Sequence, residues 1–228
     1  MASTEIAQRF QAVCEQLDTA ARRAGRDPGE VRLMAASKTQ PPQAIRAAYG
    51  AGARIFGENY VQEALTKQAE LSDLKDISWH LIGHLQTNKA RMAAGAFELI
   101  QSVDSVRLAG ALAKARDAPQ VAVLIEVNLG GEASKTGVPA DNVEALINAV
   151  RAQVEVRGLM AIPPPGPTPE HSRRFFVQLR GLRERLAAAT GLALSELSMG
   201  MSDDFEIAID EGATIVRVGR AIFGERRQ

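Results

Sequence analysis

One lysine of this 228-residue chain lies where its amine could act as a nucleophile. Lys38 follows the apolar run Leu33–Ala36 after a single serine. An amine at the end of a buried strand is partly desolvated, which lowers its pKa, and the neutral amine forms a Schiff base with an aldehyde or ketone. The alternative is a lysine whose charged end extends from a strand end into solvent. Position alone favours the alternative.

Two segments near the C-terminus carry groups that could bind a phosphate. Gly200–Ser202 precedes a helix predicted to begin near Asp203, and Gly219-Arg220 lies near the end of the last apolar run. Glycines let backbone N–H groups approach an anion closely, and a helix N-terminus favours negative charge. The alternative is that Ser202 or Asp203 only caps the helix, with Glu206 completing a capping box. The two interpretations are compatible.

Arg217 places a charge inside the apolar run Ile215–Val218. If this run is a strand of a closed sheet, an inward-facing arginine needs a charged partner or a ligand. An internal ion pair and a ligand contact explain the position equally well.

The elements that would position these residues alternate along the chain. Eight short apolar runs read as strands, and amphipathic stretches between them read as helices, a pattern typical of parallel βαβ units. The strands are expected at Val31–Ser37, Arg54–Asn59, Trp79–Gly83, Leu99–Asp104, Val121–Asn128, Glu155–Ile162, Glu196–Met201 and Thr214–Phe223, and the clearest helices at Gln43–Gly50, Asn59–Gln68, Val106–Arg116, Asp141–Ala152 and His171–Thr190.

Eight repeats predict an α/β fold, a single (β/α)8 TIM barrel, whose typical size is about 250 residues. An open doubly wound sheet is the alternative, but no Gly-rich dinucleotide loop follows the first strand. A helix carrying Ile6, Phe10, Val13 and Leu17 on one face precedes the repeats. We therefore expect one domain over residues 1–228, with residues 1–27 packed on the barrel, and interpret Pro163–Pro169 as a stiff loop rather than a domain linker.

Composition excludes several functional classes. Lys and Arg number 27 and Asp and Glu 27, and this balance argues against a broad nucleic-acid surface. The single Cys14 excludes an internal disulfide and a cysteine zinc site, and three scattered histidines do not suggest a metal centre. With neither a signal-like leader nor a long apolar run, we expect a cytoplasmic protein with no membrane contact.

The polar motifs at the strand ends, taken together, resemble a known family. The sequence closely resembles the pyridoxal 5′-phosphate (PLP) homeostasis proteins, which are related to the N-terminal barrel of alanine racemase. The resemblance runs from the first helix to within four residues of the C-terminus. It is carried by Ala36–Thr39, Phe56–Glu63, Trp79–Lys89, Ser102–Asp104, Ser134–Gly137, Gly158–Met160, Leu197–Ser202 and Val216–Gly224.

The resemblance implies PLP as cofactor and assigns its binding residues. Lys38 matches the lysine that forms a Schiff base with PLP, and Arg217 the arginine that hydrogen-bonds the pyridine nitrogen. Asn59 lies where the family lines the ring, and Met199 and Met201 would add apolar wall. Ser202, Gly219 and Arg220 fall where the phosphate is held.

This chain departs from the family at Arg220, where threonine or serine is usual. The backbone N–H is retained and the hydroxyl is lost. Arginine could pair with the phosphate directly through charge-assisted hydrogen bonds, or it could point away and leave a weaker cradle. The sequence leaves both open.

The expected function is to hold PLP and to buffer, carry or deliver it, with apo-enzymes that use PLP as possible recipients. Two points argue against catalytic turnover of amino acids. An arginine facing the pyridine nitrogen would leave the ring unprotonated and therefore a weak electron sink. The racemases also have a second domain, which we expect to be absent because this sequence ends four residues after Gly224. Tyr60 is a candidate opposing base, although packing at a helix start explains it equally well. Lys135 is a speculative second amine for handing PLP on.

The alternative functions are a low-activity PLP-dependent racemase or lyase and a cofactor-free Schiff-base aldolase. No robust enzyme activity is expected. A further alternative, nucleic-acid binding through the basic helix that contains Arg173 and Arg174, has less support from the sequence. The protein is expected to be a monomer.

Overall fold

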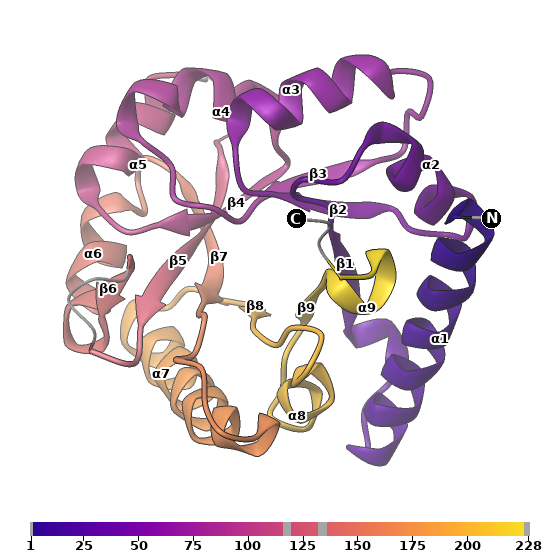
Figure 1. Ribbon diagram of the computed structural model, residues 1–228. Helices are drawn as coiled ribbons and strands as arrows, with labels where there is room; N and C mark the ends of the chain where they lie inside the picture. The colour runs from indigo at the N-terminus through magenta and orange to yellow at the C-terminus, as the bar shows by residue number, and fades with distance from the viewer. Residues whose placement is uncertain (1, 116–119, 132–135, 226–228) are drawn as a thin grey trace.

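Eight parallel strands form a closed ring at the centre of the molecule (Figure 1). The computed structural model describes residues 2–115, 120–131 and 136–225. The predicted strands are confirmed as barrel strands, with ends that agree to within five residues. They are β1 (Arg32–Ala36), β2 (Ile55–Glu58), β3 (Ser78–Leu81), β4 (Leu99–Val103), β5 (Ala122–Asn128), β7 (Glu155–Met160), β8 (Glu196–Ser198) and β9 (Ile215–Val218).

The ring closes between the first and last strands of the chain. β1 pairs in parallel with both β2 and β9, and β4 pairs with β5, so the order around the ring is β1, β2, β3, β4, β5, β7, β8, β9. The register places Met34 opposite Arg217. The short strand β6 (Val138–Pro139) adds to β5 outside the ring. The closed barrel predicted from the repeats is therefore confirmed, and the open doubly wound sheet is wrong.

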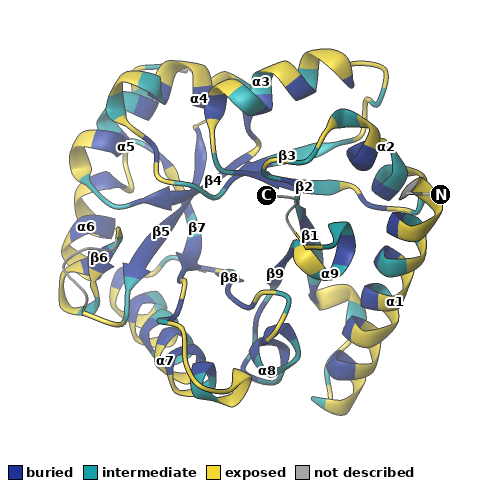
Figure 2. Cartoon of the chain, in the orientation of Figure 1, coloured by how far each residue is buried: buried dark blue, intermediate teal, exposed yellow. Residues whose placement is uncertain are grey.

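Helices surround the ring and bury their apolar faces against it (Figure 2). Between strands the chain forms amphipathic helices, as their spacing of apolar residues requires. They are α2 (Pro42–Gly50), α3 (Val61–Glu70), α4 (Ala90–Ala96), α5 (Val106–Ala113), α6 (Val143–Val150), α7 (Arg173–Thr190) and α8 (Phe205–Asp210), joined by the 3-10 turns η1 (Pro28–Glu30), η2 (Thr87–Lys89), η3 (Ala140–Asn142) and η4 (Pro169–Ser172).

The N-terminal helix α1 (Ala2–Arg23) lies against α2, α8 and α9 (Arg220–Phe223). Its predicted apolar stripe is buried, from Ile6 at 8 % exposed to Val13 at 3 %. Arg23 forms ion pairs with Glu206 and Asp210 of α8. The helix ends before Gly25, whose φ of 70° is the left-handed conformation that terminates a helix.

The interior of the ring is filled in two parts. A small apolar cluster separate from the main core contains Met34, Leu99, Leu124 and Met160. Polar side chains occupy other interior positions, and several of them are completely buried. They are His80 on β3, Gln101 on β4, Glu126 on β5, Ser198 on β8 and Arg217 on β9.

The last predicted strand is wrong in its second half. The run Thr214–Phe223 was expected to be one strand, but β9 ends at Val218 and Arg220–Phe223 is the short helix α9. The N–H groups of Ile222 and Phe223 donate to the carbonyl of Gly219, which turns the chain away from the ring. Alternation of apolar residues alone does not separate a strand from a following helical turn.

Candidate functional site

A cavity of about 750 Å³ opens at the carboxyl ends of the barrel strands, and its volume is within the ~300–1,000 Å³ range of small-ligand sites. It is lined by residues at or just beyond the carboxyl ends of β3, β2, β1, β9, β8 and β7, which are consecutive around the ring (Figure 1). Seven of the eight residues predicted to surround the cofactor are in its wall: Lys38, Asn59, Met201, Ser202, Arg217, Gly219 and Arg220.

Lys38 lies partly buried just beyond the end of β1. Met34 faces the ring interior, and alternation along a strand places Ala36 on the same side. Ala36 and Lys38 both line the cavity. The residue with the predicted reactive amine is thus part of the cavity wall.

The two neighbours of Lys38 in the chain are held by carboxylates from β2 and α3. The buried Ser37 hydroxyl donates to Glu58 Oε1 at 2.6 Å, and the Thr39 N–H donates to Glu63 Oε1 at 2.6 Å. Thr39 has a φ of 65°, a left-handed conformation that a β-branched residue rarely adopts and that costs about 1–3 kcal/mol. These contacts hold the turn that carries Lys38 in a strained conformation.

Lys67 of α3 hydrogen-bonds to the same turn and to both carboxylates. Its Nζ donates to the carbonyl of Ser37 at 2.8 Å, to Glu58 Oε1 at 2.8 Å and to Glu63 Oε1 at 2.6 Å. These three bonds use every N–H of an ammonium group. Burial raises the pKa of Glu58 above its ordinary value, opposed by the hydrogen bonds from Lys67 and Ser37. Lys67 is therefore a structural cation that supports the Lys38 turn.

Arg217 lies at the base of the cavity and is 4 % exposed. Its Nη1 donates to Ser198 Oγ at 2.7 Å and its Nη2 to the carbonyl of Ala161 at 2.9 Å. Burial lowers its pKa to about 10, opposed by Asp204 and Glu126, so the guanidinium stays charged at neutral pH. Two of its five N–H groups are used in these bonds, which leaves others for a ligand in the cavity.

Ser202 brings two backbone N–H groups together at another part of the cavity wall. Its hydroxyl oxygen accepts from the N–H of Gly219 and of Ala221, each at 3.3 Å. A Cβ on Gly219 would lie 3.3 Å from the carbonyl oxygen of Ala36, tighter than an ordinary contact. Converging N–H groups beside a hydroxyl are an arrangement suited to phosphate oxygens.

The predicted capping box at the start of α8 is wrong. The helix begins at Phe205, so its N-cap residue is Asp204. The Asp204 side chain does not cap the helix but accepts a hydrogen bond from the N–H of Met201 at 2.7 Å. Glu206 pairs with Arg23 of α1. The Ser202 hydroxyl faces the Gly219 segment rather than the helix, because the chain makes an additional turn between β8 and α8.

Arg220 extends toward carboxylates at the rim of the cavity. Its Nη2 pairs with Asp203 Oδ2, and its Nη1 lies 3.7 Å from Glu225 Oε1. The side chain is 48 % exposed. Of the two orientations that the sequence left open, the structure has the guanidinium paired with acidic side chains, while Gly219 and Ala221 contribute their N–H groups to the Ser202 hydroxyl.

The backbone of Asn59 packs closely against Gly83, which lies just after the end of β3. A Cβ on Gly83 would lie 2.3 Å from the carbonyl oxygen and 2.7 Å from the Cα of Asn59, both of which are backbone atoms. Only a glycine fits against this loop. The glycine at position 83 is therefore needed for the Asn59 backbone to take its place beside the cavity.

Two predicted residues are not brought into the cavity wall, and a third lies outside the described residues. Met199 is completely buried in the main hydrophobic core, because the alternation that turns Ser198 into the ring turns Met199 toward the helices. Tyr60 is 63 % exposed at the start of α3 and is not among the lining residues. Lys135 lies outside the described residues.

The sequence reasoning missed several residues that belong to this site. Ile82 and Ile162 line the cavity, and their signal was present, since each lies at the carboxyl end of a predicted strand. Lys67 gave a weaker signal, its spacing of four residues from Glu63 on a helix. The contact between Lys67 and Ser37 joins segments that no local pattern connects.

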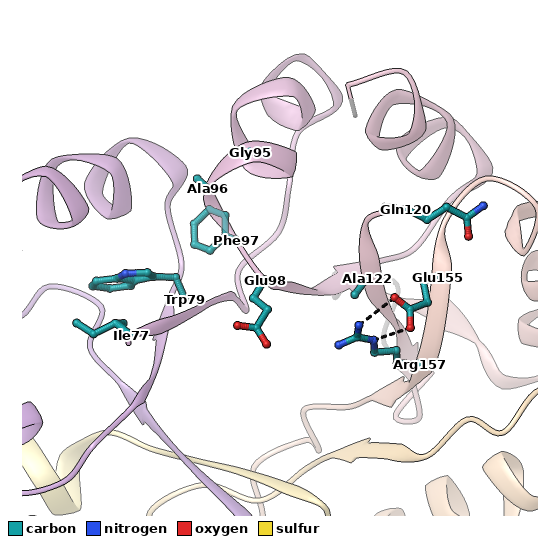
Figure 3. A pocket seen from close by; sticks show the side chains of 10 residues that line it. All are labelled: Ile77, Trp79, Gly95, Ala96, Phe97, Glu98, Gln120, Ala122, Glu155 and Arg157. Carbon is teal, nitrogen blue, oxygen red and sulfur yellow. Dashed lines mark hydrogen bonds and ion pairs between the residues drawn. The ribbon is translucent and has the colours of Figure 1, made fainter. Parts of the chain in front are cut away.

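A second cavity, of about 420 Å³, lies at the opposite ends of the strands (Figure 3). Glu155 and Arg157 point toward each other in it and are joined by two hydrogen bonds of 2.9 Å. None of the predicted site residues lines it. We therefore place the candidate site in the first cavity, where barrel enzymes also have theirs.

The described residues, 2–115, 120–131 and 136–225, contain neither a cluster of metal-ligand side chains nor a helix able to span a membrane. No group of three His, Cys, Asp or Glu side chains is arranged to hold a metal ion within these ranges. Among the same residues, no helix combines the length and the apolar character needed to cross a membrane.

This chain is similar in fold to solved structures, and to some of them also in sequence. The structure of PipY from Synechococcus elongatus PCC7942 with PLP bound matches with a TM-score of 0.84 and 42% identity, over 96% of this chain and 100% of that chain. Alanine racemase from Corynebacterium glutamicum matches with a TM-score of 0.72 and 21% identity, over 95% of this chain and 62% of that chain. The second likeness concerns the fold alone.

Curated relatives and a family model agree with this likeness. The model for "Alanine racemase, N-terminal domain" matches residues 9–227. The pyridoxal phosphate homeostasis protein of Aquifex aeolicus is 46% identical over 224 residues, covering 96% of this chain and 98% of the relative. That of Pseudomonas aeruginosa is 48% identical over 225 residues, covering 97% and 96%. The chain belongs to the pyridoxal phosphate homeostasis protein family, which is built on the N-terminal barrel of alanine racemase.

Proposed function

We propose that this protein binds PLP in the cavity at the carboxyl ends of its strands and acts in PLP homeostasis. The observation that carries the proposal is that Lys38, Arg217 and the Ser202–Gly219 pair line one cavity. These are an amine, a buried cationic donor and a set of oxygen-binding groups. They complement the aldehyde, the ring nitrogen and the phosphate of PLP.

Each of these residues has a defined part in the proposal. Lys38 attaches the aldehyde reversibly, on a turn fixed by the Glu58–Lys67 pair beneath it. Arg217 donates to the ring nitrogen from the base of the cavity, and Asn59 lies along the wall. Ser202 and the N–H groups of Gly219 and Ala221 hold the phosphate.

Storage and delivery fit this site better than turnover. When bound, PLP supplies an electron sink for carbanions, and the sink is strong when the ring nitrogen is protonated. Arg217 has no acceptor atom and stays charged at neutral pH, so it can only donate to that nitrogen. Reversible capture by Lys38 keeps a reactive aldehyde out of solution. PLP-dependent apo-enzymes are the proposed recipients, and we propose a cytoplasmic monomer.

The visible spectrum of purified protein tests the proposal. Added PLP is expected to give a new absorbance band, and borohydride is expected to fix the pyridoxyl group covalently on Lys38, as found by peptide mass spectrometry. Lys38→Ala should lose the covalent product. A protein that stays colourless with excess PLP would contradict the proposal.

Two further assays separate a carrier from a catalyst. Transfer of bound PLP to an apo-enzyme, followed by recovery of that enzyme's activity, supports delivery. Exchange of the α-proton of amino acids that depends on both PLP and Lys38 would instead support a racemase or lyase.

A further inference from the structure

A chain of hydrogen bonds crosses the interior of the barrel beneath the cavity. Arg217 Nη1 donates to Ser198 Oγ at 2.7 Å, and Ser198 Oγ donates to Gln101 Oε1 at 2.6 Å. Gln101 Nε2 lies 3.0 Å from His80 Nδ1, and His80 Nε2 lies 3.1 Å from Ser78 Oγ. The chain thus runs from β9 and β8 across the ring to β4 and β3 (Figure 1).

The hydrogen bonds of this chain have one direction, because its first member can only donate. With Ser198 Oγ accepting from Arg217, its own proton goes to the carbonyl oxygen of Gln101. The amide nitrogen of Gln101 then donates to His80 Nδ1, which must be unprotonated. His80 therefore carries its proton on Nε2 and donates it to Ser78 Oγ.

The reversed amide gives a poorer arrangement. With the nitrogen of Gln101 toward Ser198, the serine hydroxyl would accept from two donors and its proton would lose the Gln101 oxygen as acceptor. Such a loss is costly here, since Ser198 and Gln101 are 0 % exposed and His80 2 %. A buried polar group without a partner costs about 1–3 kcal/mol. Satisfaction of every group thus selects one amide orientation and one imidazole tautomer.

His80 is a fixed neutral member of this chain at physiological pH. Burial, together with the smaller effect of the charges of Arg32 on β1 and Arg157 on β7, lowers its pKa to about 3. A neutral imidazole presents one acceptor and one donor, as the chain requires.

We propose that Ser198, Gln101 and His80 are positioning residues that fix the guanidinium of Arg217 for the ligand in the cavity. None of the three lines the cavity. They act by giving Nη1 a single acceptor whose own orientation is set from the far side of the barrel. The carbonyl of Ala161 fixes Nη2 in the same way. The inference rests on the proposed function, in which that ligand is PLP.

The first test uses the unliganded protein and is independent of PLP. Nitrogen-15 NMR of labelled protein at pH 7 reports the imidazole tautomer, and we expect His80 to have its proton on Nε2. In Ser198→Ala and in Gln101→Leu we expect a mixture of tautomers, because the bond that selects one is lost. A proton on Nδ1 of His80, or a mixture in the unaltered protein, overturns the proposal.

The second test measures PLP binding in the same two variants. We expect the dissociation constant for PLP to rise at least fivefold and the absorbance maximum of the bound state to shift, since Arg217 is proposed to donate to the ring nitrogen. Ser198→Thr retains a hydroxyl and should restore both. Thr190→Val is the matched control, because Thr190 is buried and its hydroxyl bonds only to nearby backbone groups, donating to the carbonyl of Leu186 at 2.7 Å and accepting from the N–H of Leu192 at 3.4 Å.

The outcomes separate this inference from the proposed function. If the unaltered protein fails to bind PLP, the proposed function is wrong, while the tautomer of His80 still decides whether the directional chain exists. If PLP binds and the Ser198 and Gln101 variants match Thr190→Val in affinity and spectrum, the positioning role is wrong and the function stands. A variant that fails to fold leaves the tautomer measurement on the unaltered protein to decide.

Discussion

The ammonium of Lys67 lies 2.8 Å from the carbonyl oxygen of Ser37, the residue directly before Lys38. A helix that follows β2 thereby holds the turn that follows β1. The same ammonium contacts Glu58 and Glu63, and Glu63 accepts from Thr39 on the other side of Lys38. One buried cation thus supports the residue proposed to bind the cofactor without touching the cavity.

Replacement of Lys67 by methionine should destabilise the protein by about 3–5 kcal/mol, because it leaves the Glu58 carboxylate buried without its cation. Urea unfolding at pH 7.5 measures the change. The dissociation constant for PLP should also rise, since the Lys38 turn loses a contact on Ser37.

Two further variants control this prediction. Lys75→Met removes an exposed lysine and should change stability by less than about 0.5 kcal/mol. Glu58→Gln combined with Lys67→Met should recover part of the loss, because it removes the unpaired charge. Equal stability of the Lys67 and Lys75 variants would show that the buried pair is not needed.

Replacement of Gly83 by alanine should displace the Asn59 loop. The new Cβ would lie 2.3 Å from the carbonyl oxygen of Asn59, a backbone atom that cannot move aside as a flexible side chain could. We therefore expect the free energy of unfolding to fall by about 1–3 kcal/mol and PLP to bind more weakly. Gly95→Ala is the control. Gly95 lies in α4 with no atom within 4 Å of a Cβ, so alanine there should stabilise the helix by about 0.5–1 kcal/mol. Thermal unfolding of both variants decides, and a destabilised Gly95 variant would argue against this comparison.

The stability of the protein should fall in acid through His80. Its pKa is about 3 in the folded protein and about 6.5 in an unfolded chain, so the unfolded state binds a proton that the folded state excludes. The contribution is fully present above pH 6.5 and is lost as the pH falls toward 3. Between pH 7.5 and 4.5 the loss should be about 3 kcal/mol.

Urea unfolding of the unaltered protein and of His80→Gln at these two pH values isolates this contribution. Glu58 and Glu126, whose pKa values are raised by burial, act in the opposite direction and are common to both proteins. The variant should therefore show a smaller loss. The same pH dependence in both proteins would refute the assignment to His80.

The two residues proposed at the phosphate should differ in importance. Ser202→Ala removes the hydroxyl that meets the N–H groups of Gly219 and Ala221, and the dissociation constant for PLP is expected to rise about tenfold. Arg220→Thr removes a guanidinium that pairs with Asp203 and Glu225, so a change below about threefold is expected. Absorbance titration compares them. If the arginine variant loses more affinity than the serine variant, Arg220 leaves its carboxylates and binds the phosphate.

Much of the fold could be read from the sequence because local patterns determine it. Eight apolar runs and the helices between them specify a parallel barrel, and the site residues follow from the rule that barrel sites form at strand ends. The apolar stripe around Phe10 likewise predicted how α1 packs. These features depend on residues close together in the chain.

The errors came from contacts between distant segments. Met199 was assigned to the cavity wall. Its neighbour Ser198 instead points into the ring and accepts from Arg217, so Met199 points outward into the main core. Ser202 does not cap α8, because its hydroxyl meets the N–H of Gly219, 17 residues later. The chain of polar groups through Gln101 and His80 also joins residues from separate strands. Local spacing contains no information on such contacts.

The ring closure between β1 and β9 also has a consequence for folding. Met34 and Arg217 are paired although about 180 residues separate them in the chain, and Lys38 and Gly219 lie at the same seam. Closing so long a loop is a late event in barrel folding, since its entropic cost comes before the contacts that repay it. A nascent chain therefore presents Lys38 well before the groups proposed to hold the rest of PLP. Tight capture of the cofactor would then mark the moment when the barrel is complete, and bound PLP would resist reopening of the seam.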